Sequence, residues 1–183
     1  MLFKELSKEV QIKVLNNFRC NDPDNHDYAY QNVIDNATHY FKSIGIHGAQ
    51  FVWSGFGSQG DGVRLDECEY IDLERLCKLC NIECEDFFKD ITLSIYKNRS
   101  ANRYTSHTTF SLEFDEGMTS ELTADQYTIL GAHEYLLTAK VREQCMNVYK
   151  ELYDEYMFIN SDEYVTSTIE GNEYEFNPCG CII

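Results

Sequence analysis

Two strand-like runs near the middle of the chain are joined by the segment Trp53-Ser54-Gly55-Phe56-Gly57-Ser58-Gln59-Gly60-Asp61-Gly62. The run before it, 49–53, is rich in β-forming residues, and the run after it, 63–70, alternates apolar and polar side chains, as half-buried strands do. Its four glycines permit backbone angles and close approaches that other residues resist, while Ser58, Gln59 and Asp61 supply polar tips. The sequence therefore predicts two strands joined by a long loop, which is either a demanding turn or a binding site.

Part of this loop, Gly55 to Gly60, matches the G-x-G-x-x-G pattern of dinucleotide-binding proteins. In those proteins the pattern opens a helix whose N-terminus faces the pyrophosphate. Here the following residues Val63 and Leu65 alternate with polar neighbours, which indicates a strand, and no lysine stands where a P-loop needs one. The strand that follows the loop, and the absence of the lysine, therefore disfavour nucleotide binding of the Rossmann or P-loop type.

Outward from the loop, apolar residues at helical spacing predict helices over about 7–18, 27–44, 72–81, 123–156 and 161–169. The long helix opens on a capping box, Thr123-Ala124-Asp125-Gln126. Clean alternation over 91–96 and 108–114 leaves one sheet face wet, which favours an antiparallel sheet, and 172–176 is a candidate edge strand. We predict one α+β domain over 1–183, with about four antiparallel strands, helices packed on one face, and a flexible tail from about 178.

The charge of the chain is strongly negative and unevenly placed. The net charge is −16, and residues 113–183 alone contain 15 acidic and 3 basic residues. Such a surface repels DNA and anionic membranes and accelerates association with a basic partner. Acidic surface also serves solubility alone, so the charge favours a basic protein partner without establishing one.

The cysteines and the first residues bear on compartment and metal binding. The first residues after Met1 lack the apolar core of a secretion signal, and no apolar run reaches the roughly 18–20 residues of a membrane span. Eight cysteines without a secretion signal indicate reduced thiols. We therefore expect a cytoplasmic protein. A zinc site would combine Cys77, Cys80 and Cys84 with Cys179 and Cys181. A single C-x-x-C on an apolar helix stripe is more often core filling, which is the interpretation we favour.

Several segments together resemble a family of small, uncharacterised tailed-phage proteins. The shared features are an N-terminal E-L-S helix, the S-G-F-x-S-Q-G-D-G strand end, an R-Y-x-x-H pattern, a Y-x-x-L-x-x-E-Y run, S-D-E, and a closing N-E-Y-E-F. In this chain they are Glu5–Ser7, Ser54–Gly62, Arg103–His107, Tyr149–Tyr156, Ser161–Glu163 and Asn172–Phe176. Members are sometimes labelled antitoxins of toxin–antitoxin systems, and the family supplies no catalytic residues. The family has a bulky aromatic residue where this chain has Gly57, so the resemblance implies that the G-x-G match is incidental.

A polar patch is predicted around the central loop, because His107 begins the fourth predicted strand and is expected, with Tyr104 and Arg103, to lie close to that loop. The patch would comprise Trp53, Ser54, Phe56, Ser58, Gln59, Asp61, Tyr104 and His107. Asp61 and His107 would form an acid–base pair in an enzyme. The alternative, which we favour, is that His107 hydrogen-bonds Asp61 or the loop backbone and holds the turn, since no further catalytic group stands at a motif-defined spacing.

The long C-terminal helix interleaves tyrosines with acidic residues. Tyr149, Tyr153 and Tyr156 stand among the carboxylates of Glu143, Glu151, Asp154 and Glu155. Aromatic rings are enriched at protein interfaces, and carboxylates among rings can imitate nucleic acid for a basic partner. An amphipathic helix with a solvated acidic face remains the alternative interpretation.

These patterns together favour a non-enzymatic, phage-borne binding protein without cofactor. We expect it to titrate a basic host, defence or toxin protein, as a monomer or homodimer, and to bind neither nucleic acid nor membrane. The alternative is a nucleotide-sequestering or other small-ligand-binding protein that uses the glycine-rich loop 54–62, and the third is a hydrolytic enzyme that uses Asp61 and His107.

Overall fold

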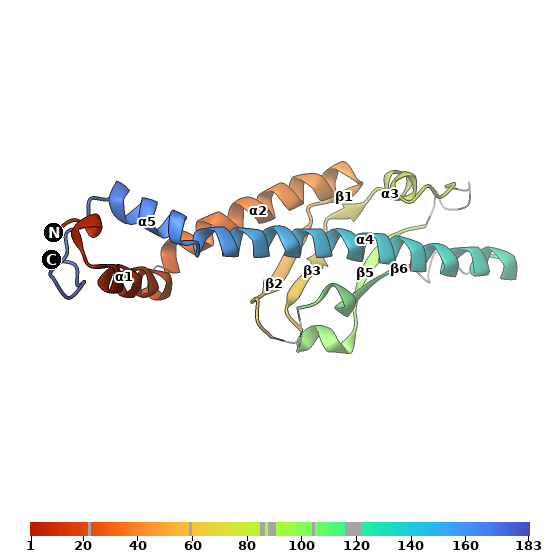
Figure 1. Cartoon of the computed structure of the whole chain (residues 1–183). Coiled ribbons are helices and arrows are strands. Elements are labelled where there is room, and N and C mark those ends of the chain that lie inside the picture. The colour runs from red at the N-terminus through yellow and green to blue at the C-terminus, as the bar shows by residue number, and fades with distance from the viewer. Residues whose placement is uncertain (22, 59, 85–86, 88–90, 104, 116–121) are drawn as a thin grey trace. The chain divides into compact units, whose positions relative to one another are not determined.

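The computed structural model describes residues 1–21, 23–58, 60–84, 87, 91–103, 105–115 and 122–183 (Figure 1). The chain divides into two compact units. Residues 1–32 and 152–183 form the first, which we call the terminal unit, and residues 33–151 form the second, the central unit. Two long helices, α2 (Pro23–Ser43) and α4 (Ala124–Ile159), contribute residues to both units.

The terminal unit is built from η1 (Phe3–Glu5), α1 (Lys8–Asn21), α5 (Asp162–Gly171) and the segment that follows α5. The two chain ends lie side by side (Figure 1), because the Met1 ammonium donates to the Phe176 carbonyl and the Phe176 N–H donates to the Met1 carbonyl. A buried apolar cluster fills the unit: Phe3, Leu6, Val14, Leu15, Val165, Ile169 and Phe176. The predicted helix over 161–169 is confirmed as α5, and the Ser161 hydroxyl caps it by accepting from the Tyr164 N–H.

The tail beyond residue 178, which we expected to be loose, is folded back onto the terminal unit. The side-chain oxygen of Asn177 accepts hydrogen bonds from the backbone N–H groups of Cys179 and Cys181, at 2.9 and 3.0 Å. Gly180 takes a positive φ of +86°, and an added Cβ there would lie 2.9 Å from methyl carbons of Val10 and Val14. Glycine therefore lets the tail approach α1 closely, a contact between distant segments that no local pattern reports.

The central unit contains three antiparallel strand pairs. They are β1 (Ile46–His47) with β4 (Tyr70–Ile71), β2 (Gln50–Ser54) with β3 (Gly62–Glu67), and β5 (Leu93–Lys97) with β6 (Phe110–Phe114). The α+β class and the antiparallel pairing are confirmed. The predicted sheet of about four strands is instead divided into two-stranded pieces. One reason is that side chains of α4, described below, occupy the outer edge of β6 where a further strand would pair.

Helices of the central unit follow the predicted signals closely. Asp72 caps α3 (Leu73–Leu79) by accepting from the Arg75 N–H, and the capping box at Thr123 and Gln126 forms at the start of α4. Two short 3-10 segments, η3 (Arg99–Asn102) and η4 (His107–Thr109), lie between β5 and β6, so β6 begins later than the alternation predicted. None of the described helices combines the length and the apolar character needed to cross a membrane.

Pro23 is the first residue of α2, which therefore begins earlier than the predicted start at about 27. Proline is tolerated in the first turn of a helix because its missing N–H has no partner there. Gly45 follows α2 with a φ of +101°, as a C-terminal cap requires. The core between the helices and strands is formed by Phe41, Ile46, Val63, Leu65, Leu76, Phe110, Leu112, Leu137, Val141 and Cys145.

Candidate functional site

The carboxylate of Asp61 organises the loop between β2 and β3. It accepts hydrogen bonds from the backbone N–H groups of Gly57 and Ser58 at 2.8 and 2.6 Å. It also accepts from the hydroxyls of Ser58 and Ser54 at 2.9 and 3.3 Å. One acidic side chain therefore ties both arms of the loop together, and its oxygens are engaged by the loop itself.

These bonds favour the charged form of Asp61 and lower its pKa, chiefly through the Ser58 N–H and then the Gly57 N–H. Because the folded-state pKa lies below the unfolded one, the stabilisation is present above the ordinary aspartate pKa of about 3.9 and is lost as the pH falls through the folded value. The sign of this linkage makes the loop a source of acid sensitivity.

We expect Asp61→Asn to lower the urea midpoint of unfolding at pH 7, since an amide oxygen replaces a charged acceptor of several hydrogen bonds. The difference between the variant and the wild type should shrink as the pH falls below about 4, where the wild-type carboxylate is also protonated. Urea unfolding followed by circular dichroism at several pH values measures this. A difference that is independent of pH would contradict the assignment.

Three neighbouring aromatic rings, those of Trp53, Phe56 and Tyr149, pack the loop against α4. The rings of Trp53 and Phe56 lie 6.0 Å apart, and those of Phe56 and Tyr149 lie 5.8 Å apart. The Tyr149 hydroxyl also donates to the Gly55 carbonyl at 3.3 Å. Tyr149, which the sequence suggested as part of an interaction face, therefore contacts the loop within the protein.

The predicted polar patch is assembled only in part. Ser54, Ser58 and Asp61 lie together as described, whereas Gln59 and Tyr104 fall outside the described residues. His107, at the start of η4, lies beside Arg142 of α4, and no hydrogen bond of the described residues joins it to Asp61. Burial, and then the charge of Arg142, lower the pKa of His107. The described geometry does not make an acid–base pair of Asp61 and His107.

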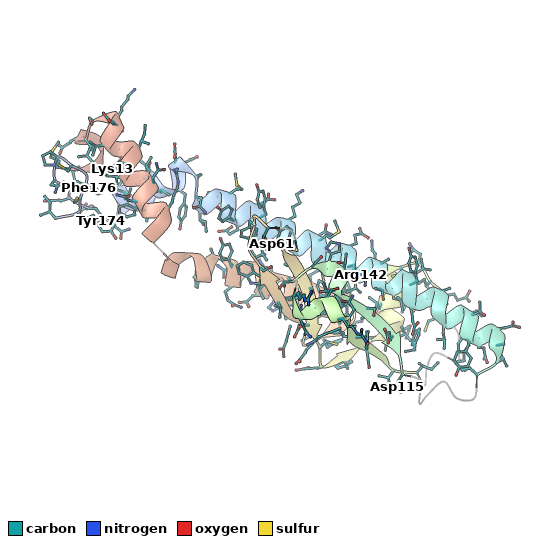
Figure 2. All side chains as sticks on the ribbon, turned by 90° about the horizontal axis from the view of Figure 1, so that it is seen from below. Lys13, Asp61, Asp115, Arg142, Tyr174 and Phe176 are labelled. Atoms are coloured by element: carbon teal, nitrogen blue, oxygen red, sulfur yellow. The ribbon has the colours of Figure 1, made fainter. Side chains whose placement is uncertain are left out.

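Three side chains on one face of α4 satisfy the outer edge of β6 (Figure 2 labels Arg142). The Phe114 N–H donates to the Glu134 carboxylate at 2.7 Å, and the Leu112 N–H donates to the Thr138 hydroxyl at 2.9 Å. The Arg142 Nε donates to the Phe110 carbonyl at 2.9 Å. Four helical residues rise about 6 Å and two strand residues about 6.8 Å, so positions i, i+4 and i+8 of the helix match alternate residues of the strand.

A groove of about 540 Å³ runs between α4 and this end of β6. Its lining comprises His107, Thr108, Ser111, Leu112, Glu113, Gly131, Glu134, Tyr135, Thr138, Ala139, Arg142, Glu143 and Met146. Of these, the sequence singled out His107 and Glu143 alone. The available signal was Glu134, Thr138 and Arg142, polar residues repeated every fourth position on a helix otherwise treated as an apolar stripe.

The cysteines are distributed between the two units. Cys77 is buried and contacts Cys84, and burial raises the pKa of the Cys77 thiol to about 12. Cys80 is half-buried, whereas Cys179 and Cys181 are exposed in the terminal unit. Within the part of the chain that the structure describes, no group of three or more His, Cys, Asp or Glu side chains is arranged to hold a metal ion.

The predicted acidic face lies on α4. Glu143 forms a salt bridge with Lys140 at 2.8 Å. Glu151 and Asp154 are exposed and Glu155 is half-buried, and none of these three has a salt-bridge partner among the described residues. The acidic character of this helix is therefore strongest toward its C-terminal end.

In comparisons with known proteins, no family model, curated protein or solved structure matches the chain. The resemblance to tailed-phage proteins accordingly stays a prediction.

Proposed function

We propose that this protein is a non-enzymatic binding protein that inhibits or titrates a basic protein by stoichiometric association. The intended partner is a host, defence or toxin protein in the cytoplasm of a phage-infected bacterium. The acidic surface would steer the encounter, because complementary potentials raise association rates.

The observation that carries this proposal is the uncompensated charge of residues 152–183. This segment contains seven acidic residues and no lysine or arginine: Asp154, Glu155, Asp162, Glu163, Glu170, Glu173 and Glu175. Among the described residues, Asp162 is the member of this set that forms a salt bridge, with Arg19. The remaining charges are available to an external cation.

The central loop gives secondary support. Its single carboxylate accepts four hydrogen bonds from its own loop, which leaves Asp61 a structural rather than a chemical task. This favours binding over the hydrolytic alternative, in which Asp61 would have to exchange protons with a substrate.

Affinity capture from infected bacterial lysate at low and high salt, followed by titration with each purified captured protein, tests the proposal. We expect a one-to-one complex whose association rate falls steeply between about 50 and 500 mM salt, because exposed charges are screened beyond a Debye length of roughly 10 Å at 0.1 M. A captured partner with an acidic surface, or an affinity indifferent to salt, would contradict it.

Paired charge variants locate the effect. Glu151→Gln combined with Asp154→Asn removes two exposed charges from the C-terminal end of α4, and Glu9→Gln combined with Glu83→Gln removes two exposed charges elsewhere. We expect the first pair to slow association several-fold more than the second, measured by stopped-flow or surface plasmon resonance at low salt. Equal effects would show that net charge alone, and not this face, governs the encounter.

A further inference from the structure

We propose that the groove between β5 and the β3–β4 segment receives an extended, basic stretch of the partner protein, which pairs with the outer edge of β5 as an added strand. The inference deepens the proposed function, on which it rests, because it names the surface of this chain and the kind of partner segment that associate. The surface is the edge of the β5–β6 pair that lies opposite the edge occupied by α4.

Side chains of α4 cover the outer edge of β6. The N–H groups of Leu112 and Phe114 donate to the Thr138 hydroxyl and the Glu134 carboxylate. Because the backbone groups of successive residues point to opposite sides of a strand, residues that bond to α4 cannot also bond to β5. The hydrogen bonds between β6 and β5 therefore come from the residues between and beside them, including Ser111.

The outer edge of β5 is formed by Leu93, Ile95 and Lys97. Ser94 and Tyr96 lie opposite the residues of β6 that face β5, so the backbone groups of the other three point away from β6. Within the described ranges, no hydrogen bond joins the backbone N–H or C=O groups of these three residues to another segment. Backbone polar groups nearly all have partners in proteins, and an unpaired strand edge is a template for a further strand.

A groove of about 580 Å³ lies along this edge. β5 lies near β3 and β4 (Figure 1), and residues 66–71 form the wall of the groove that faces β5. The two walls are joined at Lys97, whose ammonium lies 2.8 Å from the Asp66 carboxylate. An added strand lies about 4.8 Å from the strand with which it pairs, so it would occupy this groove.

The charges of the groove favour a basic occupant. Its described lining includes the carboxylates of Asp66, Glu67 and Glu69, and Lys97 is its basic residue. Asp66 pairs with Arg64 at 2.9 Å and with Lys97 at 2.8 Å, whereas Glu67 lies 3.7 Å from Lys97. Glu69 forms no salt bridge with any described residue, and both glutamates are exposed. Glu67 and Glu69 therefore attract an incoming cation, while the net charge of −16 repels a second copy of this chain.

The two faces of β5 indicate the residue pattern of the docking segment. Leu93 is buried and Ile95 is half-buried, whereas Ser94 and Tyr96 are exposed. Ile91, which is also buried, lines the same groove. Alternate side chains of an added strand would lie on the apolar face, and the others would lie on the wet face. We therefore expect a segment in which apolar and basic residues alternate.

A capped peptide of alternating valine and lysine, of about the length of β5, is the probe. In antiparallel pairing its valines lie opposite Leu93 and Ile95 and exchange hydrogen bonds with them. Hydrogen exchange of the full ¹⁵N-labelled chain, followed by NMR, measures the pairing. We expect the amides of Leu93 and Ile95 to exchange roughly tenfold or more slowly with the peptide bound, and those of Ser94 and Tyr96, already bonded to β6, to change less.

N-methylated peptides test the backbone pairing without altering the protein. A peptide methylated at its valine nitrogens should neither bind nor protect the amides, because those N–H groups face β5, whereas one methylated at its lysine nitrogens should do both. Loss of binding confined to the lysine-methylated peptide would also support the edge and would indicate parallel pairing. Equal binding by the methylated and unmethylated peptides would overturn the inference.

Paired substitutions test the charge of the groove. Glu67→Gln combined with Glu69→Gln removes its two exposed carboxylates, and Glu9→Gln combined with Glu170→Gln removes two exposed carboxylates of the terminal unit. We expect the first pair to weaken peptide binding roughly three- to tenfold at low salt, since exposed ion pairs contribute modestly, and the second pair to change it less. Equal binding by the two variants would contradict the assignment of the groove.

Two further results would overturn the inference. Protection of the Leu93 and Ile95 amides in the free protein that is lost on dilution would identify a second copy as the occupant. Peptide-induced changes confined to other segments, such as the loop 54–62, would place the peptide elsewhere.

The failure of this inference can be told apart from the failure of the proposed function. Salt-dependent capture of a basic protein, together with either of those results, would leave the proposed function standing without this surface. Absence of such a protein, with the peptide bound along β5 as expected, would refute the proposed function and leave β5 as a peptide-binding edge.

Discussion

Phe176→Ala is expected to destabilise the terminal unit by about 3–5 kcal/mol, the range found for removal of a buried phenylalanine from a packed core. The Phe176 side chain, labelled in Figure 2, is 1% exposed. Its ring centroid lies 6.3 Å from that of Phe3 and 6.5 Å from that of Phe18. Truncation would leave a cavity between α1, α5 and the C-terminal segment. Urea unfolding followed by circular dichroism and by fluorescence measures the loss.

The matched control is Phe158→Ala, because Phe158 is 55% exposed. Its ring contacts Tyr164 at 5.1 Å, so we expect a loss of about 0.5–1.5 kcal/mol, the range for one aromatic pair. If Phe176→Ala were no more damaging than Phe158→Ala, the C-terminal segment would not be part of the core of this unit.

Thr138→Val is expected to destabilise the central unit by about 1–3 kcal/mol, although the two side chains have nearly the same volume. The Thr138 hydroxyl accepts from the Leu112 N–H at 2.9 Å and donates to the Leu112 carbonyl at 3.4 Å, and Thr138 is 6% exposed. Valine would leave both backbone groups of Leu112 buried without a partner. The penalty is that of desolvation and not of lost packing.

Thr138→Ser separates these two causes, because serine keeps the hydroxyl and removes a methyl group. We expect the serine variant to retain more stability than the valine variant, and to retain the slow hydrogen exchange of the Leu112 amide that valine abolishes. If valine were tolerated better than serine, packing rather than the hydrogen bond would hold α4 on β6.

Much of the local structure was predictable because its causes lie within a few residues. Asp72, Thr123 and Ser161 each precede a helix and can hydrogen-bond the first free N–H groups, so three helix starts were identified correctly. Alternation within 91–96 and 108–114 predicted the two strands that pair antiparallel as β5 and β6. The start of α2 was predicted too late, at about 27 instead of Pro23, because a residue that blocks a helix interior also suits a helix start.

The candidate sites were less predictable, since they depend on contacts between distant segments. The sequence drew attention to the conspicuous glycines of the loop 54–62, and the structure gives their neighbour Asp61 a task within that loop. The sequence analysis did not single out Arg142, because a single arginine on a helix is usually solvent-exposed. Its interest arises from neutral carbonyls contributed by residues more than thirty positions away.

The sequence alone determined the acidic C-terminal half, the helix caps and the antiparallel strands. These features follow from counts of charged residues or from residues that are neighbours in the sequence. Three features required the folded arrangement, namely the division of the strands into pairs, the return of the tail onto α1, and the groove beside Arg142. Each depends on which edge or face is already occupied by a distant segment. Periodicity can identify an amphipathic face, but the partner that covers it is selected by packing and by the hydrogen bonds that remain to be satisfied.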